Sequence, residues 1–238
     1  VEWFNETHNG EIDEHMAEYA NHGNLKNKII NGNFAINQRR ASTKAQPVGV
    51  YGYDMWKGHA NGLEQVIEAL PAGTYTLSWQ GGGSGTFGGV TSASPITATV
   101  TAGNRSVIVP STATKVQLEE GTYATPFEQR PIGLEMLLCQ RYQVVPQNEW
   151  FARANIITTN AIYFDVPMPA ELRTNPTVTG TLQVLTVDNV AQTGFTFSYS
   201  KRLNLSVLRV IATKTSHGLT DAVIKFFPEN GIIIDANL

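Results

Sequence analysis

The stretch Val116–Tyr142, VQLEEGTYATPFEQRPIGLEMLLCQRY, decides how the fold of this chain is interpreted. Its first residues predict a β-strand, which a polar turn and a proline-flanked extended crossing follow. The stretch ends in an apolar run that predicts a short helix over 131–142, and Pro131 suits the first position of a helix. A helix as apolar as this one is expected to be largely buried between other elements.

The residues before this helix, 27–130, carry strand candidates at short spacing, joined by turns rich in glycine and proline. In Thr74–Gln80 the residues Tyr75, Leu77 and Trp79 share one face, which is the period of a strand with one buried side. Closely spaced strands of this kind predict a β-sandwich or jelly roll. The candidates are Lys28–Ile30, Phe34–Ile36, Leu63–Ala69, Thr74–Gln80, Ile96–Val100, Ser106–Val109 and Lys115–Leu118.

The residues after the helix, 143–238, again predict strands throughout, and the last two strands are expected to form a hairpin turned at Glu229–Gly231. In Leu203–Ile211 both strand faces carry apolar residues, which predicts a strand buried on two sides or lying at a subunit contact. The candidates are Phe151–Thr158, Ala161–Val166, Thr177–Val187, Gly194–Ser200, Leu203–Ala212, Ala222–Phe227 and Gly231–Asp235.

Several stretches of the chain resemble one known family. Residues 116–142 closely resemble the joint of tail fibres and related virion proteins of tailed bacteriophages. Lys28–Arg39 (KIINGNFAINQR), Tyr51–Trp56 (YGYDMW) and Phe164–Thr179 (FDVPMPAELRTNPTVT) are similar to further elements of that family. The resemblance covers residues 27–238.

The resemblance implies an all-β protein in which a linker helix, 131–142, joins two domains. The first, 27–130, is expected to be a carbohydrate-binding-module-like jelly-roll β-sandwich, and the second, 143–238, a sandwich-like β-domain. It also implies a homotrimer in the phage virion that contacts other phage tail proteins. Outside the cell, the trimer would attach to a host surface polysaccharide or lipopolysaccharide.

The first 26 residues differ from the rest and predict a short helical leader that serves oligomerisation. His8, His15 and His22 are seven residues apart and fit the core positions of a heptad. One hypothesis is a trimeric coiled coil whose imidazoles hold a metal or an anion on the axis. The alternative is a coincidence in a solvated leader. Because the sequence starts with Val1, we expect a processed product or a fragment of a longer chain.

Composition excludes several classes of function. The formal net charge is −3, charged residues make up 16%, and no basic run is present, so nucleic acid is not expected as a partner. No apolar run reaches the roughly 20 residues of a membrane helix. The single cysteine, Cys139, excludes an intrachain disulfide and is interpreted as a small buried apolar residue.

No arrangement of residues predicts catalysis, a metal site or a cofactor. Glu119 and Glu120 are adjacent on a strand, so they point to opposite faces and cannot act as a glycosidase pair. Asp54 is interpreted as a turn former or a buried hydrogen-bond acceptor beside the core residue Trp56. Glu128 is interpreted as a structural ion-pair partner.

Sugar binding is the activity that the composition supports, because aromatic rings stack on sugar faces while amides and hydroxyls bind sugar hydroxyls. Gly81–Gly89, GGGSGTFGG, is interpreted as a flexible connection or, with Phe87 exposed, as a binding loop. The candidate glycan-binding residues are Tyr51, Tyr53, Phe87, Asn148, Trp150 and Tyr199.

Three functions are therefore considered. The preferred one is a non-enzymatic tail-fibre or receptor-binding component that attaches to a host cell-surface glycan. The second is a structural virion protein, such as a fibre spacer, tail-tip or decoration component, that binds other virion subunits. The third is a tailspike-type polysaccharide depolymerase or esterase.

Overall fold

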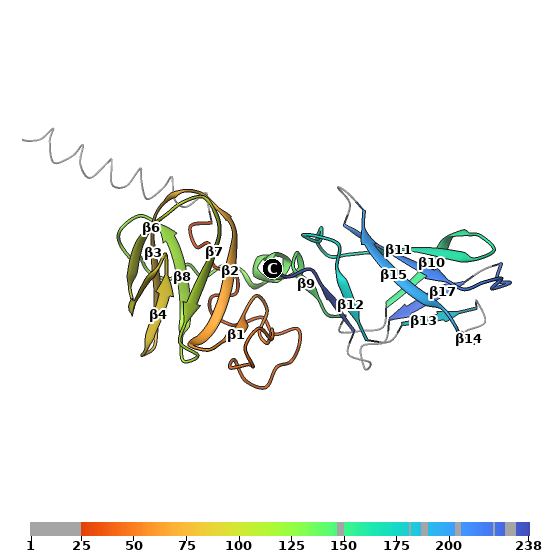
Figure 1. Cartoon of the computed structure of the whole chain (residues 1–238), viewed down its shortest axis with the longest axis horizontal. Helices are drawn as coiled ribbons and strands as arrows, with labels where there is room; N and C mark the ends of the chain where they lie inside the picture. The colour runs from red at the N-terminus through yellow and green to blue at the C-terminus, as the bar shows by residue number, and fades with distance from the viewer. Residues whose placement is uncertain are drawn as a thin grey trace, which may run out of the picture. The chain divides into compact units, whose positions relative to one another are not determined.

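A computed structural model describes residues 25–146, 150–180, 182–186, 190–202, 206–220, 222–226 and 232–238. The predicted leader helix with its three histidines, and Asn148, lie outside these residues. Over the described residues the chain is mostly β, with several antiparallel sheets and one short helix (Figure 1). The chain forms two compact units: residues up to Asn33 together with Gly58–Gln129, and Phe34–Lys57 together with Arg130–Leu238.

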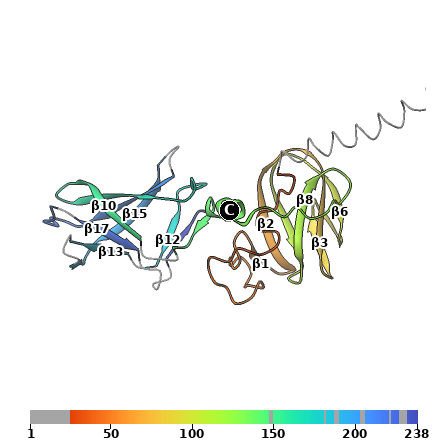
Figure 2. The same ribbon diagram turned by 180° about the vertical axis from the view of Figure 1, so that it is seen from behind.

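The first unit contains a five-stranded sheet, in the order β1-β2-β7-β4-β5, and a three-stranded sheet, in the order β6-β3-β8. Figures 1 and 2 show these strands from opposite sides. The strands of the larger sheet are β1 (Lys57–His59), β2 (Gly62–Leu70), β4 (Ser84–Phe87), β5 (Val90–Ala93) and β7 (Gly103–Val109). Those of the smaller sheet are β3 (Gly73–Gln80), β6 (Ile96–Val100) and β8 (Thr114–Glu120).

Each sheet of the first unit has one apolar, buried face. In the smaller sheet Leu77 pairs with Leu118 on one side and Ile96 on the other, and all three are buried. In the larger sheet Leu63 pairs with Val109, and both are buried. Alternation along each strand places these residues on one face, as the sequence pattern predicted for Tyr75, Leu77 and Trp79.

The two sheets of the first unit come into contact where glycines leave room. A Cβ on Gly85 of β4 would lie 2.8 Å from the ring of Trp79 on β3, so only a glycine lets this ring pack against β4. Trp79 is buried, as predicted. In the turn after β4, a Cβ on Gly88 would lie 2.6 Å from the Cβ of Ala98 on β6.

The glycine-rich stretch Gly81–Gly89 is not a flexible connection, and Phe87 is not exposed. The structure forms β4 here, paired with both β5 and β7, and Phe87 is fully buried. The strand alternates, with Gly85 and Phe87 facing inward and Ser84 and Thr86 facing outward. The glycine content hid this short alternation in the sequence.

The stretch Val116–Tyr142 folds back on itself after β8. Glu119 and Gln117 on β8 are buried, and they bind the return segment 125–128. The Glu119 carboxylate accepts hydrogen bonds from the Thr125 backbone N–H at 2.8 Å and the Thr125 hydroxyl at 2.6 Å. Gln117 accepts one from the Glu128 backbone N–H at 2.7 Å. Glu120 is exposed, which confirms that the two neighbouring glutamates point to opposite faces.

Asn27 completes this arrangement from the other end of the unit's sequence. Its backbone N–H donates to the Glu128 carboxylate at 2.8 Å. Its side-chain oxygen accepts from the backbone N–H groups of Ile29 at 2.9 Å and Leu118 at 3.1 Å. Buried polar side chains therefore join the opening segment, β8 and the return segment.

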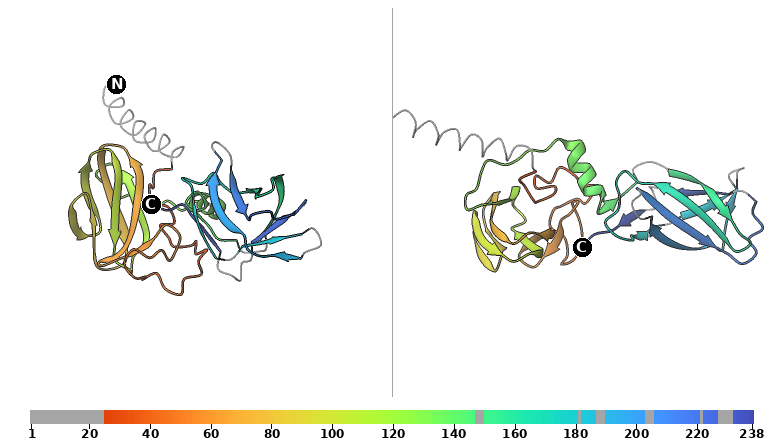
Figure 3. Two further views of the ribbon diagram at one scale, coloured as in Figure 1. Left: turned by 45° about the vertical axis from the view of Figure 1, so that its right-hand side comes forward. Right: turned by 90° about the horizontal axis from the view of Figure 1, so that it is seen from above.

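The second unit contains a seven-stranded sheet, in the order β14-β13-β17-β10-β11-β16-β15, a three-stranded sheet, in the order β12-β18-β9, and helix α2 (Ile132–Gln140). Figure 3 shows α2 leading into these strands. Strands β9 to β13 are Gln143–Val144, Trp150–Ile157, Ala161–Pro167, Thr177–Thr179 and Leu182–Leu185. Strands β14 to β18 are Ala191–Gln192, Thr196–Lys201, Val207–Thr213, Val223–Phe226 and Ile233–Asp235.

The strand expected over Leu203–Ala212 is observed as β16. Leu208 and Val210 are buried in the core, whereas Val207 and Ile211 are half-buried on the opposite face. Arg209 lies on that second face and binds Asp165 of β11. Among the described residues, the outer face of β16 is therefore mixed rather than continuously apolar. Leu203 lies outside the described residues, and the predicted subunit contact stays a prediction.

Helix α2 is less buried than its composition predicted. It buries Glu135 and Cys139 on one side, while Ile132 is 59% exposed and Leu137 is 46% exposed. Glu135 faces inward because it forms an ion pair with the buried Arg130 at 3.1 Å. The helix therefore leaves part of its apolar surface exposed on the single chain.

Residues 34–57 belong to the second unit, whereas the sequence placed them in the first sandwich. Gln38 donates to the Gln143 backbone oxygen at 3.0 Å, and Arg39 forms an ion pair with Asp235 at 2.6 Å. Trp56 is buried, as predicted, with its ring 5.1 Å from that of Phe34. These long-range contacts are invisible in a local sequence pattern.

Replacing Glu119 with Ala is expected to lower the free energy of unfolding of the first unit by about 1–3 kcal/mol, because the buried Gln117 amide and the part-buried donors of Thr125 lose their acceptor. Replacing the exposed Glu120 with Ala is the matched control, with an expected change within about 0.5 kcal/mol. Urea titrations followed by circular dichroism measure both. Equal effects of the two replacements would contradict the assigned role of Glu119.

Candidate functional site

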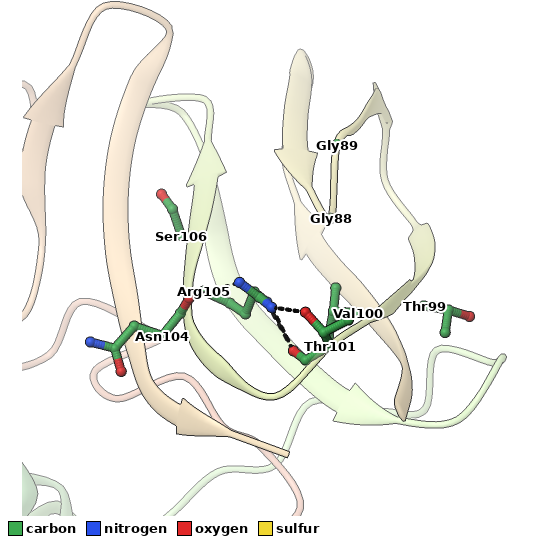
Figure 4. A pocket seen from close by; sticks show the side chains of 8 residues that line it. All are labelled: Gly88, Gly89, Thr99, Val100, Thr101, Asn104, Arg105 and Ser106. Atoms are coloured by element: carbon green, nitrogen blue, oxygen red, sulfur yellow. Dashed lines mark hydrogen bonds between the residues drawn. The ribbon is translucent and has the colours of Figure 1, made fainter. Parts of the chain in front are cut away.

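The first unit carries an open hollow of about 460 Å³ between two turns. One turn joins β4 to β5 and the other joins β6 to β7. Figure 4 shows the hollow from close by. Its lining residues are Gly88, Gly89, Thr99, Val100, Thr101, Asn104, Arg105 and Ser106.

Arg105 is the charged residue of this lining, and the β6–β7 turn holds its guanidinium in place. Nη2 donates to the backbone oxygen of Thr101 at 2.7 Å and also to the Thr101 hydroxyl. Nε donates to the same backbone oxygen at 3.1 Å, and Nη1 donates to the Asn104 backbone oxygen at 3.2 Å. Gly103, the first residue of β7, follows this turn with φ +129°, a conformation that favours glycine.

These acceptors are neutral, so they orient the guanidinium without cancelling its charge. Within the part of the chain that the structure describes, Arg105 forms no ion pair with a carboxylate. Nη1 carries two N–H groups and has one acceptor there, the Asn104 oxygen. The half-buried Arg105 therefore offers a full positive charge and a spare N–H to the hollow.

The β4–β5 turn forms the opposite wall with bare backbone. Gly88 and Gly89 are a two-residue hairpin turn with φ of +57° and +81°, the conformation that favours glycine at both positions. A Cβ on Gly89 would meet nothing within 4 Å. The positive φ favours glycine at this position, and the space beside it is open.

Other polar side chains of the lining are committed to the surrounding sheet. Asn104 accepts from the Ala69 backbone N–H at 3.0 Å, and Figure 4 shows its side chain pointing away from Arg105. Ser106 donates to Glu64 at 2.5 Å. The lining contains no His, Cys, Asp or Glu, so it offers no general base or metal ligand of these types.

The structure does not gather the glycan-binding residues predicted from the sequence. Phe87 is in the core of the first unit, beneath the β4–β5 turn, and its ring is not available to a ligand. Trp150 begins β10 in the second unit. Tyr199, on β15, is half-buried and packs against the core of that unit, and burial raises the pKa of its hydroxyl.

Tyr51 and Tyr53 are half-buried within the second unit. The Tyr51 hydroxyl donates to the Leu238 backbone oxygen at 2.7 Å, and the Arg39 guanidinium carbon is 5.9 Å from its ring centre. Tyr53 packs edge-on against Phe34 with ring centres 6.2 Å apart. These contacts give both rings a structural role.

Asp54 is a buried hydrogen-bond acceptor, as predicted. Its carboxylate accepts from the Gln38 backbone N–H at 2.7 Å and from the Gln38 side-chain amide. Burial nevertheless raises the pKa of Asp54, against the opposing effects of these hydrogen bonds and of Arg39. Cys139 is fully buried in the same unit, as predicted, and burial raises the pKa of its thiol well above its ordinary value. A thiol in this state is a poor nucleophile.

Asp165 is the contrasting carboxylate, on the outer face of the second unit's larger sheet. Arg209 donates to it through Nε at 2.7 Å and Nη2 at 2.8 Å, and Arg202 donates at 2.9 Å. The hydrogen bond from Arg209, followed by that from Arg202, lowers the pKa of Asp165 despite its partial desolvation. The two arginines are therefore neutralised by a carboxylate, unlike Arg105.

Sequence reasoning missed Arg105, although a signal for it was present. Val107 and Val109 on β7 face inward, so alternation places Arg105 on the same inward face. An arginine at an inward-facing position of a strand needs partners that its neighbours in sequence do not predict. Here the partners are backbone oxygens of the preceding turn.

Two further observations concern the described residues. No group of three or more His, Cys, Asp or Glu side chains is placed to hold a metal ion among them. Over the same residues, no helix has the length and apolarity required to cross a membrane.

Comparison of the chain with protein-family models, with curated proteins and with solved structures finds no match in any of the three. The comparisons therefore assign no family. The resemblance to phage tail fibres rests on the motif residues quoted from the sequence.

Replacing Asp54 or Asp165 with Asn is expected to change the pH dependence of stability in opposite directions. Because the pKa of Asp54 is raised in the fold, its carboxyl group loses its proton at a lower pH in the unfolded chain than in the folded one. Wild-type stability therefore declines as the pH rises above about 4. The lowered pKa of Asp165 stabilises the fold above about pH 4, and this contribution is lost as the pH falls.

Urea titrations of the wild type and both variants between about pH 3 and pH 7 measure these contributions. With rising pH, stability relative to the wild type should increase for Asp54→Asn and decrease for Asp165→Asn. Differences that change in the same direction for both variants would contradict the assigned environments.

Proposed function

We propose that this protein is a non-enzymatic attachment component of a bacteriophage virion, which binds a host cell-surface glycan through the hollow at Arg105. The observation that carries the proposal is the composition of this hollow. A held guanidinium, a threonine hydroxyl and bare glycine backbone surround an open space, and the lining residues include no acid or base for catalysis.

Size and chemistry support a sugar as the ligand. The hollow of about 460 Å³ lies within the range of roughly 300–1,000 Å³ that small-ligand sites occupy. Sugar hydroxyls accept hydrogen bonds from a guanidinium and exchange them with a threonine hydroxyl such as that of Thr101. The turns that form the hollow are fixed by their strands, so little ordering is required for binding.

The arrangement of the sheets within each unit is also part of the proposal. We propose that the first unit is a jelly-roll β-sandwich and that the second is sandwich-like. In the first unit, the contact between Trp79 and Gly85 joins two sheets that each bury one face, which supports this arrangement. The resemblance to tail fibres supports a homotrimer in the virion that contacts other phage tail proteins and acts outside the cell.

The second candidate function is a structural virion protein that binds other virion subunits. The exposed apolar residues of α2 favour it, because Ile132, Leu134 and Leu137 leave apolar area that a neighbouring subunit would cover. Both candidates accommodate a homotrimer, and they differ in whether the hollow binds a glycan.

The test is binding of labelled protein to a panel of immobilised bacterial surface polysaccharides. The variant is Gly89→Asn, because Gly89 lines the hollow, an added Cβ would meet nothing within 4 Å, and asparagine tolerates positive φ. We expect affinity for the recognised polysaccharide to fall about tenfold or more. Gly49→Asn is the matched control, since Gly49 has φ +79° and open surroundings in the second unit.

Three results would contradict the proposal. Equal loss of affinity in both variants would show that the hollow is not the binding site. Failure to bind any polysaccharide, together with tight binding to another virion protein, would favour the structural candidate. Release of reducing ends or acetate from a polysaccharide would identify an enzyme.

A further inference from the structure

We infer that the hollow selects an acidic sugar, whose carboxylate is bound by the Arg105 guanidinium. The inference rests on the proposed function and adds the class of glycan. It follows from the placement of Arg105, from its charge and from the remaining lining of the hollow.

The guanidinium is held in position before any ligand binds. Nε, Nη1 and Nη2 all donate to oxygens of residues 101–104, at distances from 2.7 to 3.3 Å for the backbone acceptors. Ordering a free arginine side chain on binding would cost entropy. Because the turn has already ordered this one, a ligand gains the full benefit of the contact.

The charge of Arg105 is available, whereas those of Arg130, Arg202 and Arg209 are paired with carboxylates. Arg209 and Arg202 share Asp165, and Arg130 is paired with Glu135. Arg105 instead contacts neutral oxygens within the described residues. Glu64 is bound to Ser106, the next residue of β7, whose side chain belongs to the other face of the strand. An anion is the ligand that this environment stabilises most.

The rest of the lining favours an acidic sugar over a neutral one. None of the lining residues is aromatic, so a neutral sugar would lack the ring on which its C–H face stacks. A carboxylate gains a charge-assisted hydrogen bond from the spare N–H of Nη1, which is about twice as strong as a neutral one. The remaining sugar hydroxyls are left to Thr101 and the glycine backbone.

A carboxylate fits better than a phosphate monoester. The hollow presents one cation, Arg105, and no lysine or second arginine lines it. One guanidinium balances the single negative charge of a carboxylate, whereas a phosphate monoester carries nearly two charges at neutral pH. The expected ligands are therefore polysaccharides that contain uronic or other carboxylated sugars.

The experiment uses the full chain and a panel of acidic bacterial polysaccharides, each tested before and after chemical reduction of its carboxyl groups to alcohols. Native polymer should bind, and the reduced polymer should bind about tenfold or more weakly, because it keeps the hydroxyls and loses the charge. Raising the salt concentration from about 0.05 to 0.5 M should weaken binding of the native polymer, since salt screens the exposed part of the contact.

Variants connect this preference to Arg105. Arg105→Gln should bind the native and reduced polymers with equal affinity, which is a loss of preference rather than of binding alone. Arg202→Gln is the matched control, because it removes an exposed arginine of the second unit and should retain the preference. Thermal unfolding checks that Arg105→Gln keeps its fold. Since the polymer comparison uses wild-type protein, it stands even if this variant unfolds.

The outcomes separate the inference from the proposed function. Equal affinity of the wild type for native and reduced polymers would overturn the acidic-sugar inference and leave glycan binding intact. A preference for phosphorylated polymers over carboxylated ones would overturn it as well. No binding to any polymer would overturn both.

Discussion

The burial of Gln117 and Glu119 on β8 is the constraint on which the first unit depends. Their polar groups are out of water, so the return segment 125–128 must supply hydrogen-bond partners. That requirement fixes the chain where it leaves β8. The same strand pairs with β3, where Leu118 faces Leu77 in the core. Polar bonds on one face and apolar packing on the other therefore fix the position of β8.

Two glycines allow the close contacts that connect the core of the first unit to the hollow. The Trp79 ring reaches β4 because Gly85 has no side chain, and Gly88 lets the β4–β5 turn approach Ala98 on β6. The two turns beside the hollow therefore rest on contacts inside the unit. A site built on such turns is prearranged, and this is why we propose that the hollow, rather than an exposed aromatic residue, binds the ligand.

Arg105 of the first unit differs from the paired charges of the second unit. In the second unit, Arg130 is paired with Glu135, Asp165 is bound by two arginines, and Asp54 is buried with hydrogen bonds from Gln38. The charges of Arg130 and Asp165 are compensated by opposite charges, whereas burial still raises the pKa of Asp54. The partners of Arg105 are neutral oxygens, which fix the position of the guanidinium and leave its positive charge uncompensated. This difference separates a structural arginine from one suited to a ligand.

The sequence alone determined that the chain is β-rich, that a short helix divides it, and that Trp56, Trp79 and Cys139 are buried, because alternation and apolar runs are local signals. Only the tertiary structure placed residues 34–57 with the second unit, buried Phe87 and exposed one side of α2. It also placed Arg105 at the hollow. The physical reason is that each of these outcomes depends on partners distant in sequence or on backbone oxygens, and a local pattern of side chains records neither.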